Sequence, residues 1–390
     1  MSEAKGTSCL TDSRKNFKMN KSINDEEHAL FPATAIATID VRAIVANYKT
    51  LTQYVAPAEC SAVVKANAYG LGAHKIAPAL YQAGCRIFFV AKIEEALQLK
   101  NILPSNITLA LLNGLPHTAE EFVAQSGIIP VLNSWKEIEN WQILCQKKHK
   151  KFPAIIQINT NMNRLGLDKK ELEKLIKQPS IFENAEIKYL LSHLANGEDD
   201  THSSNDIQLA VFRNLLAKLP ICKVSFANSG GIFLGSNFHF DLVRPGIALY
   251  GVDPNGKHQT TLKPVLKLEA QVLQSRFVDA GIPVGYGESF ITKRPSTLAT
   301  ISIGYADGWP RILSNKGSVY FNGHKLPIVG RVSMDSIIVD ATDLDKKPQR
   351  GDWIELIGPH QTLEKIATDA NTIPNEILTS LGNRYKRIYI

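Results

Sequence analysis

From Ala62 to Tyr250, short apolar runs alternate with segments in which apolar residues recur every three or four positions. Such runs predict buried strands, and the helical spacing predicts amphipathic helices. The predicted strands are Ala62–Lys65, Ile87–Ala91, Ile107–Leu112, Ile128–Leu132, Ala154–Ile158, Ile187–Ser192, Lys223–Ala227 and Asp241–Tyr250, and the segments between them include Ile93–Leu99, Ser134–Leu144, Lys169–Ile176 and Asn205–Leu219. Eight strand-and-helix units without a long N-terminal Gly-x-Gly-x-x-Gly turn favour a closed TIM-like (β/α)8 barrel over an open doubly wound sheet.

After about Thr261 the pattern changes to short apolar alternations separated by Gly, Pro and Asp turns, which predicts a compact all-β domain. The predicted strands here are Val265–Leu273, Thr297–Ile303, Ser318–Phe321, Lys325–Val329, Ser336–Val339 and Trp353–Leu356, with one helix near Thr362–Thr368. We therefore expect a solvated N-terminal tail (1–30), a barrel (31–261) and a C-terminal β-domain (262–390), with the strand at 35–39 pairing with the β-domain.

Composition narrows the class of protein. With 390 residues, of which 44% are hydrophobic and 21% charged, the chain is long enough for two cored domains. It has no apolar run of about 18 residues and no apolar signal-peptide core, so we expect no membrane span. The five cysteines are scattered and never form Cys-x-x-Cys, which suggests no metal site, no disulfide framework and a cytoplasmic location. The net charge of +7 is spread along the chain, so nucleic acid is a weak candidate partner.

The ten residues from Val63 to Gly72, Val-Val-Lys-Ala-Asn-Ala-Tyr-Gly-Leu-Gly, place Lys65 at the end of a buried strand and Tyr69 in the turn that follows. Desolvation at such a position lowers an amine's pKa, as a Schiff-base lysine requires. An isolated lysine after two valines would more often extend to solvent from a sheet edge. The full string is much more specific than that.

Four further stretches of the predicted barrel contain candidate site residues, and each has a structural alternative. Arg164 offers a planar fork for a carboxylate, or is a surface arginine. His193 ends a strand, either as a structural histidine or stacked on an aromatic cofactor. Asn228–Gly231 can grip a phosphate or simply cap a helix. Arg244, before a proline-glycine turn, is ambiguous by itself.

In the β-domain, Tyr286 and Tyr305 each stand among glycines, and Gly330–Asp335 forms another turn. Tyrosines in turns are usually packing residues with a solvated hydroxyl. Two glycine-flanked tyrosines in one small domain are more suggestive of a site.

From about Ala35 to Arg387, these stretches resemble the alanine racemases, in the same order along the chain. The resemblance implies that Lys65 holds pyridoxal 5'-phosphate (PLP) as an internal aldimine and is one of two bases, while Tyr286 of the partner subunit in a homodimer is the other. It also implies a phosphate site (Tyr69, Ser229, Gly246, Ile247), ring contacts (His193, and Arg244 at the pyridine nitrogen), a site for the substrate carboxylate (Arg164 and the backbone of Met334) and supporting residues from the partner (Tyr305, Asp335).

Two positions depart from the family's pattern. Gln157 stands where many members have a lysine, sometimes carbamylated, that braces the substrate-binding arginine. Asn375 stands where many have a tyrosine that helps bind phosphate and narrows the entrance. The orientation of Arg164, the affinity for the cofactor and the size limit on substrates therefore stay open.

The leading interpretation is a homodimeric PLP-dependent racemase that interconverts L- and D-alanine through an external aldimine and supplies D-alanine for peptidoglycan synthesis. A racemase of broader specificity, acting on serine or other amino acids, is an alternative. A basic amino acid decarboxylase is opposed by Arg244, because a guanidinium facing the pyridine nitrogen keeps that nitrogen unprotonated. A non-catalytic PLP carrier is opposed by the β-domain with its two tyrosines.

Overall fold

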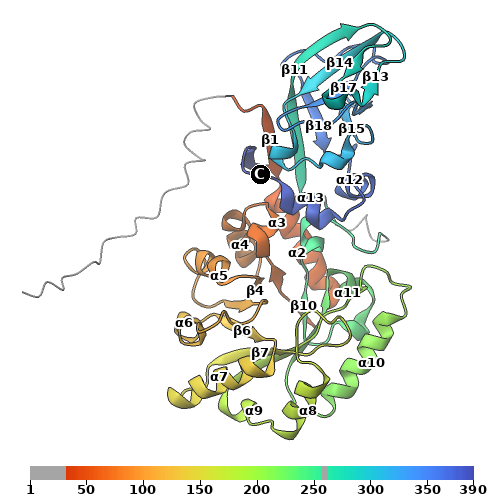
Figure 1. Ribbon diagram of the computed structural model, residues 1–390. Helices are drawn as coiled ribbons and strands as arrows, with labels where there is room; N and C mark the ends of the chain where they lie inside the picture. Colours follow the sequence, from red (N-terminus) through yellow and green to blue (C-terminus); the bar gives the residue numbers. More distant parts are fainter. Residues whose placement is uncertain (1–31, 257–261) are drawn as a thin grey trace, which may run out of the picture. The chain divides into compact units, whose positions relative to one another are not determined.

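The computed structural model in Figure 1 describes residues 32–256 and 262–390. The predicted tail (1–30) lies outside the described residues, and so do residues 31 and 257–261 of the predicted barrel. Between Glu59 and Arg244, strands and helices alternate. The strands are β2 (Glu59–Cys60), β3 (Ala62–Val63), β4 (Ile87–Val90), β5 (Thr108–Leu111), β6 (Ile129–Leu132), β7 (Pro153–Gln157), β8 (Glu186–Leu191), β9 (Val224–Asn228) and β10 (Leu242–Arg244). The α-helices are α3 (Lys65–Tyr69), α4 (Ala73–Gln82), α5 (Ile93–Lys100), α6 (Glu120–Ser126), α7 (Trp135–Lys147), α8 (Lys169–Lys177), α9 (Ile181–Asn184), α10 (Ser204–Leu216) and α11 (Ser229–Phe233).

All these strands are parallel, in the order β2-β10-β9-β8-β7-β6-β5-β4-β3. The two ends of this order belong to one strand, because Ser61 alone separates β2 from β3. The backbone N–H groups of Ser61 and Val63 donate to the carbonyls of Val243 (3.1 Å) and Pro245 (2.9 Å) beside the last strand. The first strand thus contacts both of its neighbours, and the predicted (β/α)8 barrel is confirmed.

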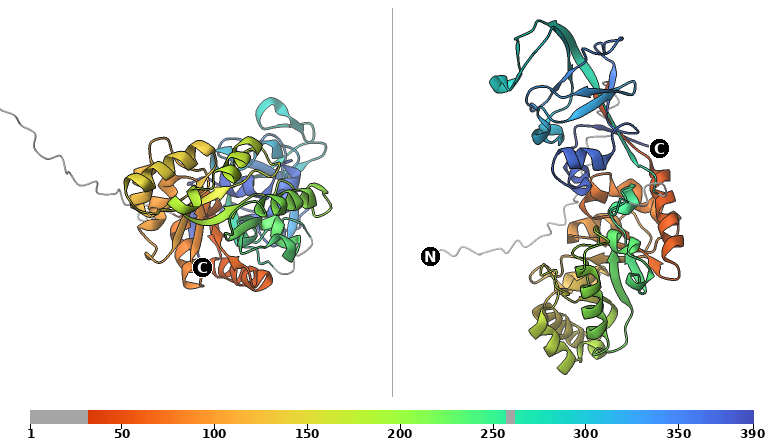
Figure 2. Two further views of the ribbon diagram at one scale, coloured as in Figure 1. Left: turned by 90° about the horizontal axis from the view of Figure 1, so that it is seen from below. Right: turned by 90° about the vertical axis from the view of Figure 1, so that its right-hand side faces the viewer.

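The hydrophobic pattern explains which faces are buried. All residues of β4 and β6 are buried, as expected for parallel strands covered on both faces. In Figures 1 and 2, the helices coloured orange to green lie outside the strands. Helix α7 begins after Ser134, whose side chain accepts the N–H of Glu137 (3.3 Å), and it buries Ile138, Trp141 and Leu144 at helical spacing.

The β-domain is built on the long strand β11 (Leu266–Val278). The first half of β11 pairs antiparallel with β1 (Ala35–Ile39) and β18 (Trp353–Ile357), and the second half pairs with β14 (Ser296–Ile301). On its other edge β1 pairs in parallel with β19 (Lys386–Tyr389). The other elements are β12 (Pro283–Val284), β13 (Phe290–Ile291), β15 (Ser318–Phe321), β16 (His324–Pro327), β17 (Ile337–Asp340), α12 (Leu363–Asp369) and α13 (Pro374–Ser380). Helix α2 (Val41–Val55) connects β1 to the barrel.

The eighth barrel strand is shorter than predicted. It ends at Arg244, and Ile247–Tyr250 forms the 3-10 helix η2. Pro245 has no N–H to offer a neighbouring strand, and the N–H of Gly246 donates to the side chain of Ser229 (2.8 Å). The longer strand was therefore a wrong prediction, because a side chain replaces the sheet as hydrogen-bond acceptor.

The β-domain also contains more helix than predicted. Helix α12 matches the single predicted helix, but α13 follows it directly. Pro374 occupies the first turn of α13, where its missing N–H has no cost. The sequence therefore held a start signal for this second helix that the prediction of one helix overlooked.

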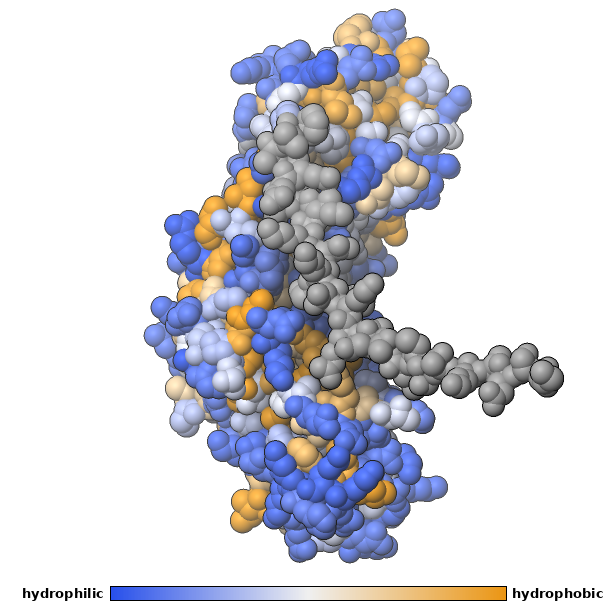
Figure 3. Space-filling model, turned by 90° about the vertical axis from the view of Figure 1, so that its left-hand side faces the viewer, coloured by the Kyte–Doolittle hydropathy of each residue, from blue (hydrophilic) through white to orange (hydrophobic). Residues whose placement is uncertain are grey.

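On the face drawn in Figure 3, hydrophobic residues are interspersed with hydrophilic ones. Within the two described ranges, no helix combines the length and the apolar content that crossing a membrane requires.

Candidate active site

Helix α3, which begins at Lys65, is one turn of left-handed helix. The four residues after Lys65 have φ between 52° and 55°. L-residues other than glycine pay about 1–2 kcal/mol each for this conformation, so the surroundings must hold the turn in place. A hydrogen bond within the turn helps to stabilise it, since the N–H of Gly70 donates to the carbonyl of Ala66 (2.7 Å). Lys65 was predicted at the end of a strand and is instead the first residue of this strained turn.

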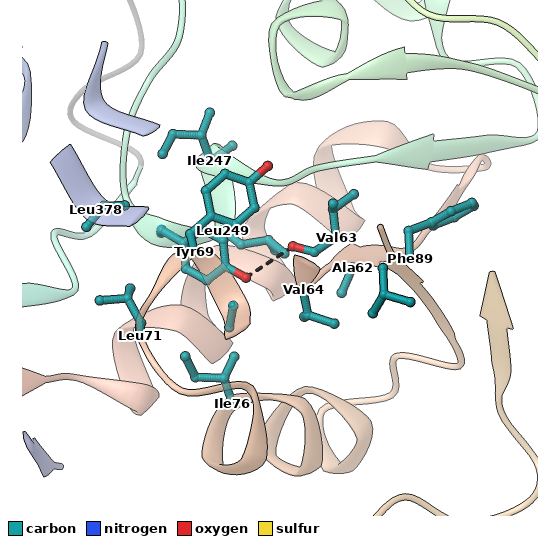
Figure 4. Close-up of a cluster of buried hydrophobic side chains, with 14 of the residues drawn as sticks. Ala62, Val63, Val64, Tyr69, Leu71, Ile76, Phe89, Ile247, Leu249 and Leu378 are labelled. Carbon is teal, nitrogen blue, oxygen red and sulfur yellow. Dashed lines mark hydrogen bonds between the residues drawn. The ribbon is translucent and has the colours of Figure 1, made fainter. Parts of the chain in front are cut away.

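The β-domain packs against the same turn. A Cβ built on Gly70 would lie 2.6 Å from the carbonyl oxygen of Leu378 in α13, and φ of Gly70 is 82°, so this position requires glycine. The Arg387 side chain donates to the carbonyl of Gly70 (3.3 Å). Figure 4 shows Leu378 beside Tyr69 and Leu71. The two domains thus meet at the segment that bears Lys65.

A cavity of about 450 Å³ lies at the carboxyl ends of the barrel strands. Its lining includes eight of the residues predicted from the sequence: Lys65, Tyr69, Arg164, His193, Ser229, Arg244, Gly246 and Ile247. These residues come from segments spread between 65 and 247, and the barrel brings them together. Barrel enzymes place their chemistry at this end of the strands.

The other four predicted residues do not line this cavity. Tyr286, Tyr305 and Met334 are 70%, 43% and 52% exposed on the β-domain, and Asp335 follows Met334. The backbones of the Tyr305 and Met334 turns are hydrogen-bonded to each other. The Arg384 guanidinium bridges these turns, with Nε 3.1 Å from the Asp307 carboxylate and Nη1 2.8 Å from that of Asp335. Tyr305, Met334 and Asp335 therefore lie together in their own chain.

Positive charge gathers around the cavity. Burial lowers the pKa of Lys65, and the nearby guanidinium groups of Arg164 and Arg244 lower it further, while Glu95 opposes them. A lowered pKa increases the fraction of neutral amine available as a nucleophile. The cations also suit an anionic ligand.

Arg244 and His193 form a buried network at the floor of the cavity. Arg244 is 3% exposed, and its guanidinium donates to Oγ of Ser225 (2.6 Å) and to the carbonyl of Ser192 (2.7 Å). One of its nitrogens lies 3.2 Å from Nδ1 of His193. Burial lowers the pKa of Arg244 to about 9, and burial with neighbouring cations lowers that of His193 well below 6.5. At neutral pH, therefore, Arg244 is charged and His193 is neutral. Nδ1 of the neutral His193 ring can accept a hydrogen bond from the Arg244 guanidinium.

Tyr69, Ser229 and Gly246 form a compact polar wall. The Ser229 hydroxyl accepts the N–H of Gly246 (2.8 Å), and a Cβ built on Gly246 would lie 2.2 Å from Oη of Tyr69. The centre of the Tyr69 ring lies 4.8 Å from that of the Tyr250 ring, and the Tyr250 hydroxyl donates to the carbonyl of Val63 (3.1 Å). Burial raises the pKa of Tyr69 to about 12, so its hydroxyl stays protonated and can donate.

The loop after β7 presents Arg164. Two hydrogen bonds join Asn159 and Asn163 in this loop. The Asn159 side-chain amide donates to Oδ1 of Asn163 (2.7 Å), and the backbone N–H of Asn163 donates to Oδ1 of Asn159 (3.0 Å). Gln157, at the end of β7, is 7% exposed and donates from its side chain to the carbonyl of Leu165 (3.3 Å). Gln157 therefore holds the backbone next to Arg164 through a neutral hydrogen bond.

The sequence reasoning missed one charged residue of the cavity. Glu198 lines it, and its charge adds to burial in raising the pKa of Tyr69. In the sequence it opens the run Glu198-Asp199-Asp200, which reads as an ordinary solvated acidic loop. Asn375 of α13, singled out as a departure from the family, also lines the cavity.

Comparison with known proteins gives the family. The model of the alanine racemase N-terminal domain matches residues 39–254, and that of the alanine racemase C-terminal domain matches residues 265–389. The chain belongs to the alanine racemase family. The family inferred from the sequence is thereby confirmed. Alanine racemase of Brucella ovis is 49% identical over 372 residues, covering 92% of this chain and 94% of the relative.

Two further relatives extend the comparison. A catabolic alanine racemase of Agrobacterium fabrum is 48% identical over 359 residues, covering 92% of each chain. The crystal structure of alanine racemase from Bartonella henselae with covalently bound pyridoxal phosphate is 83% identical, with a TM-score of 0.91, and covers 92% of this chain and 100% of that one. The barrel and β-domain architecture is thus shared with a family member across nearly its whole length.

Proposed function

We propose that this protein is a PLP-dependent alanine racemase that interconverts L- and D-alanine. The observation that supports it best is the placement of Lys65, on a strained turn, in one cavity with Arg164, Arg244 and Tyr69. Family membership and the PLP bound covalently in the Bartonella henselae relative support the same activity.

The cavity residues fit PLP. The cofactor has an anionic phosphate and an aromatic ring that contains a nitrogen. The cavity offers hydroxyl donors and cations. Its wall includes Gly246, which has no side chain to crowd the Tyr69 hydroxyl, since a Cβ there would collide with it. Lys65 would hold the cofactor covalently through Nζ, and Arg244 would donate to the ring nitrogen. The phosphate would be held by Tyr69 and Ser229, with Gly246 and Ile247 beside them, and His193 would lie near the ring. When bound, the cofactor withdraws electrons from the substrate's α-carbon and makes its proton acidic.

Inverting the α-carbon requires an acid/base group on each face. Lys65 would remove or return the proton on one face, since its lowered pKa favours the neutral amine. Tyr286 of a second copy would act on the other, because this chain's own Tyr286 is exposed and does not line the cavity. Arg164 would hold the substrate carboxylate together with the backbone of Met334 of the second copy, since this chain's own Met334 does not line the cavity. Tyr305 and Asp335 of the second copy would complete the site.

The remaining parts of the proposal concern context. We propose a homodimer with shared active sites and a division into tail (1–30), barrel (31–261) and β-domain (262–390). The proposed location is the cytoplasm, where Cys60, Cys85, Cys145 and Cys222, all free thiols in the structure, would stay reduced. The proposed role is supply of D-alanine for peptidoglycan.

The test of activity uses the purified full-length protein with L-alanine, and then L-serine and L-lysine. D-Alanine should form, Lys65→Ala should abolish its formation, and Lys75→Ala, which removes an exposed lysine of α4, should not. Borohydride should fix the cofactor on Lys65. Absence of D-alanine, or fixation on another lysine, would contradict the proposal, while comparable rates with serine would favour a broader racemase.

A further inference from the structure

Glu95 is a half-buried carboxylate that joins the ends of two neighbouring barrel strands. It lies in the first turn of α5, just after β4, and one of its oxygens accepts the N–H groups of Ala91 (2.8 Å) and Lys92 (3.1 Å). Its other oxygen accepts the N–H of Ala66 (2.6 Å), which directly follows Lys65. A single side chain therefore links the start of α5 to the left-handed turn.

The bond to Ala66 acts at the point where the backbone changes hand. Val64, before the turn, has φ of −115°, whereas Ala66 has φ of 52°. A charged acceptor forms stronger hydrogen bonds than a neutral one, so it is suited to hold a strained conformation. The side chain of Lys65 leaves the backbone one residue before this bond, and its direction depends on the same peptide.

The charge of Glu95 also affects the pKa of the Lys65 amine. The charged and titratable groups that act on Lys65 are Arg164 from the loop after β7, Arg244 from β10 and Glu95 from α5, and His193 after β8 interacts with it in turn. Among the groups that act on its pKa, Glu95 is the one that raises it, against burial and the two arginines. Without that carboxylate, all the effects that act on the pKa of Lys65 would lower it.

We propose that Glu95 is a positioning residue for Lys65, whose carboxylate anchors the left-handed turn through Ala66 and balances the positive charge around the amine. This inference rests on the proposed function for the meaning of Lys65, but both contacts are independent of any cofactor. Glu95 itself does not line the cavity, so it acts through Lys65 rather than on a substrate.

The test uses full-length protein from which hydroxylamine has removed any bound cofactor. Trinitrobenzenesulfonate modification of Lys65 is followed by peptide mass spectrometry between pH 6 and 10, with exposed Lys75 as internal reference, and amide exchange is measured for residues 66–72. Glu95→Gln keeps the shape of the side chain but removes its charge. One of the two carboxylate oxygens becomes an NH₂ group, so the backbone N–H groups on that side lose their acceptor. Glu94→Gln, an exposed neighbour in the same helical turn, is the matched control.

Glu95→Gln should lower the midpoint pH of Lys65 modification by roughly 0.5 unit and accelerate exchange in residues 66–72 about tenfold, and Glu94→Gln should change neither. If Gln prevents folding, Glu95→Asp serves instead, and it should accelerate exchange while largely keeping the midpoint. An unchanged midpoint or unchanged exchange in Glu95→Gln would overturn the proposal. Failure of the proposed function would appear separately, as absence of racemisation by the unsubstituted protein.

Discussion

The Tyr69 hydroxyl lies so close to the backbone of Gly246 that a methyl group on this glycine would be 2.2 Å from it. Gly246→Ala should displace the Tyr69 hydroxyl and weaken the proposed phosphate site. Loss of one hydrogen bond to a charged group is worth about 1.5–3 kcal/mol, so the affinity for PLP should fall about 10- to 100-fold. The affinity is measured by titrating PLP into cofactor-free protein.

Gly382→Ala is the matched control, because a Cβ there would meet no atom closer than 3.4 Å. It should bind PLP like the parent. Equal affinity in Gly246→Ala and the parent would show that Tyr69 does not contact the cofactor.

A second prediction concerns Gln157, which holds the carbonyl of Leu165 next to Arg164. Gln157→Leu removes the donor, so Arg164 should be less well oriented toward the substrate carboxylate. KM for alanine should rise about fivefold, equivalent to about 1 kcal/mol, with a smaller change in kcat. Gln98→Leu, on the exposed side of α5, should change neither constant. A fall in kcat at constant KM would be evidence against a role in substrate binding.

A third prediction concerns Arg384 and stability. Asp307 is 5% exposed, and burial raises its pKa while Arg384 lowers it. In Arg384→Leu that pKa should rise further, so the folded state would bind a proton that the unfolded state has released, and stability should fall as pH rises above about 4. Because Arg384 is half exposed, we expect a loss of about 1–2 kcal/mol at pH 7, and less at pH 4.

The comparison uses the melting temperatures of Arg384→Leu and the parent at pH 4 and pH 7. Arg276→Leu, a change at another arginine of the β-domain that contacts Gln274, is the control for lost charge. A destabilisation that is the same at both pH values would mean that Asp307 does not depend on Arg384.

The barrel could be predicted because its buried strands are continuous apolar runs, as in β4 and β6, and such runs are typical of parallel strands covered on both faces. The conformation of Lys65–Tyr69 could not, because Ala and Tyr have no intrinsic preference for the left-handed region. Contacts distant in sequence hold that turn, including Leu378 and Arg387 against Gly70. The true end of the eighth strand likewise depends on Ser229, a residue from another loop.

Some residues of the candidate site could likewise be predicted from the sequence, and others could not. Its residues in the barrel could be identified from motifs, and the structure places eight of them around one cavity. Glu198 and Glu95 could not, because each stands in sequence as an ordinary acidic residue of a loop or a helix start. Their proximity to Tyr69 and Lys65 arises only when the barrel closes.

Lys65 lines the cavity, whereas Tyr286 of the same chain is exposed on the β-domain, so each site should need two chains. The direct test mixes the Lys65→Ala and Tyr286→Ala variants, each expected to be inactive alone, under subunit exchange and measures D-alanine formation. Random exchange makes half of the dimers hybrids with one intact site each, so about a quarter of the parent activity should return.

The control replaces the second protein by the double variant Lys65→Ala/Tyr286→Ala, which leaves Lys65 in no chain and should stay inactive. Exchange itself is followed by native mass spectrometry. Recovery of activity in the first mixture alone is the predicted result, and no recovery despite demonstrated exchange would show that both bases come from one chain.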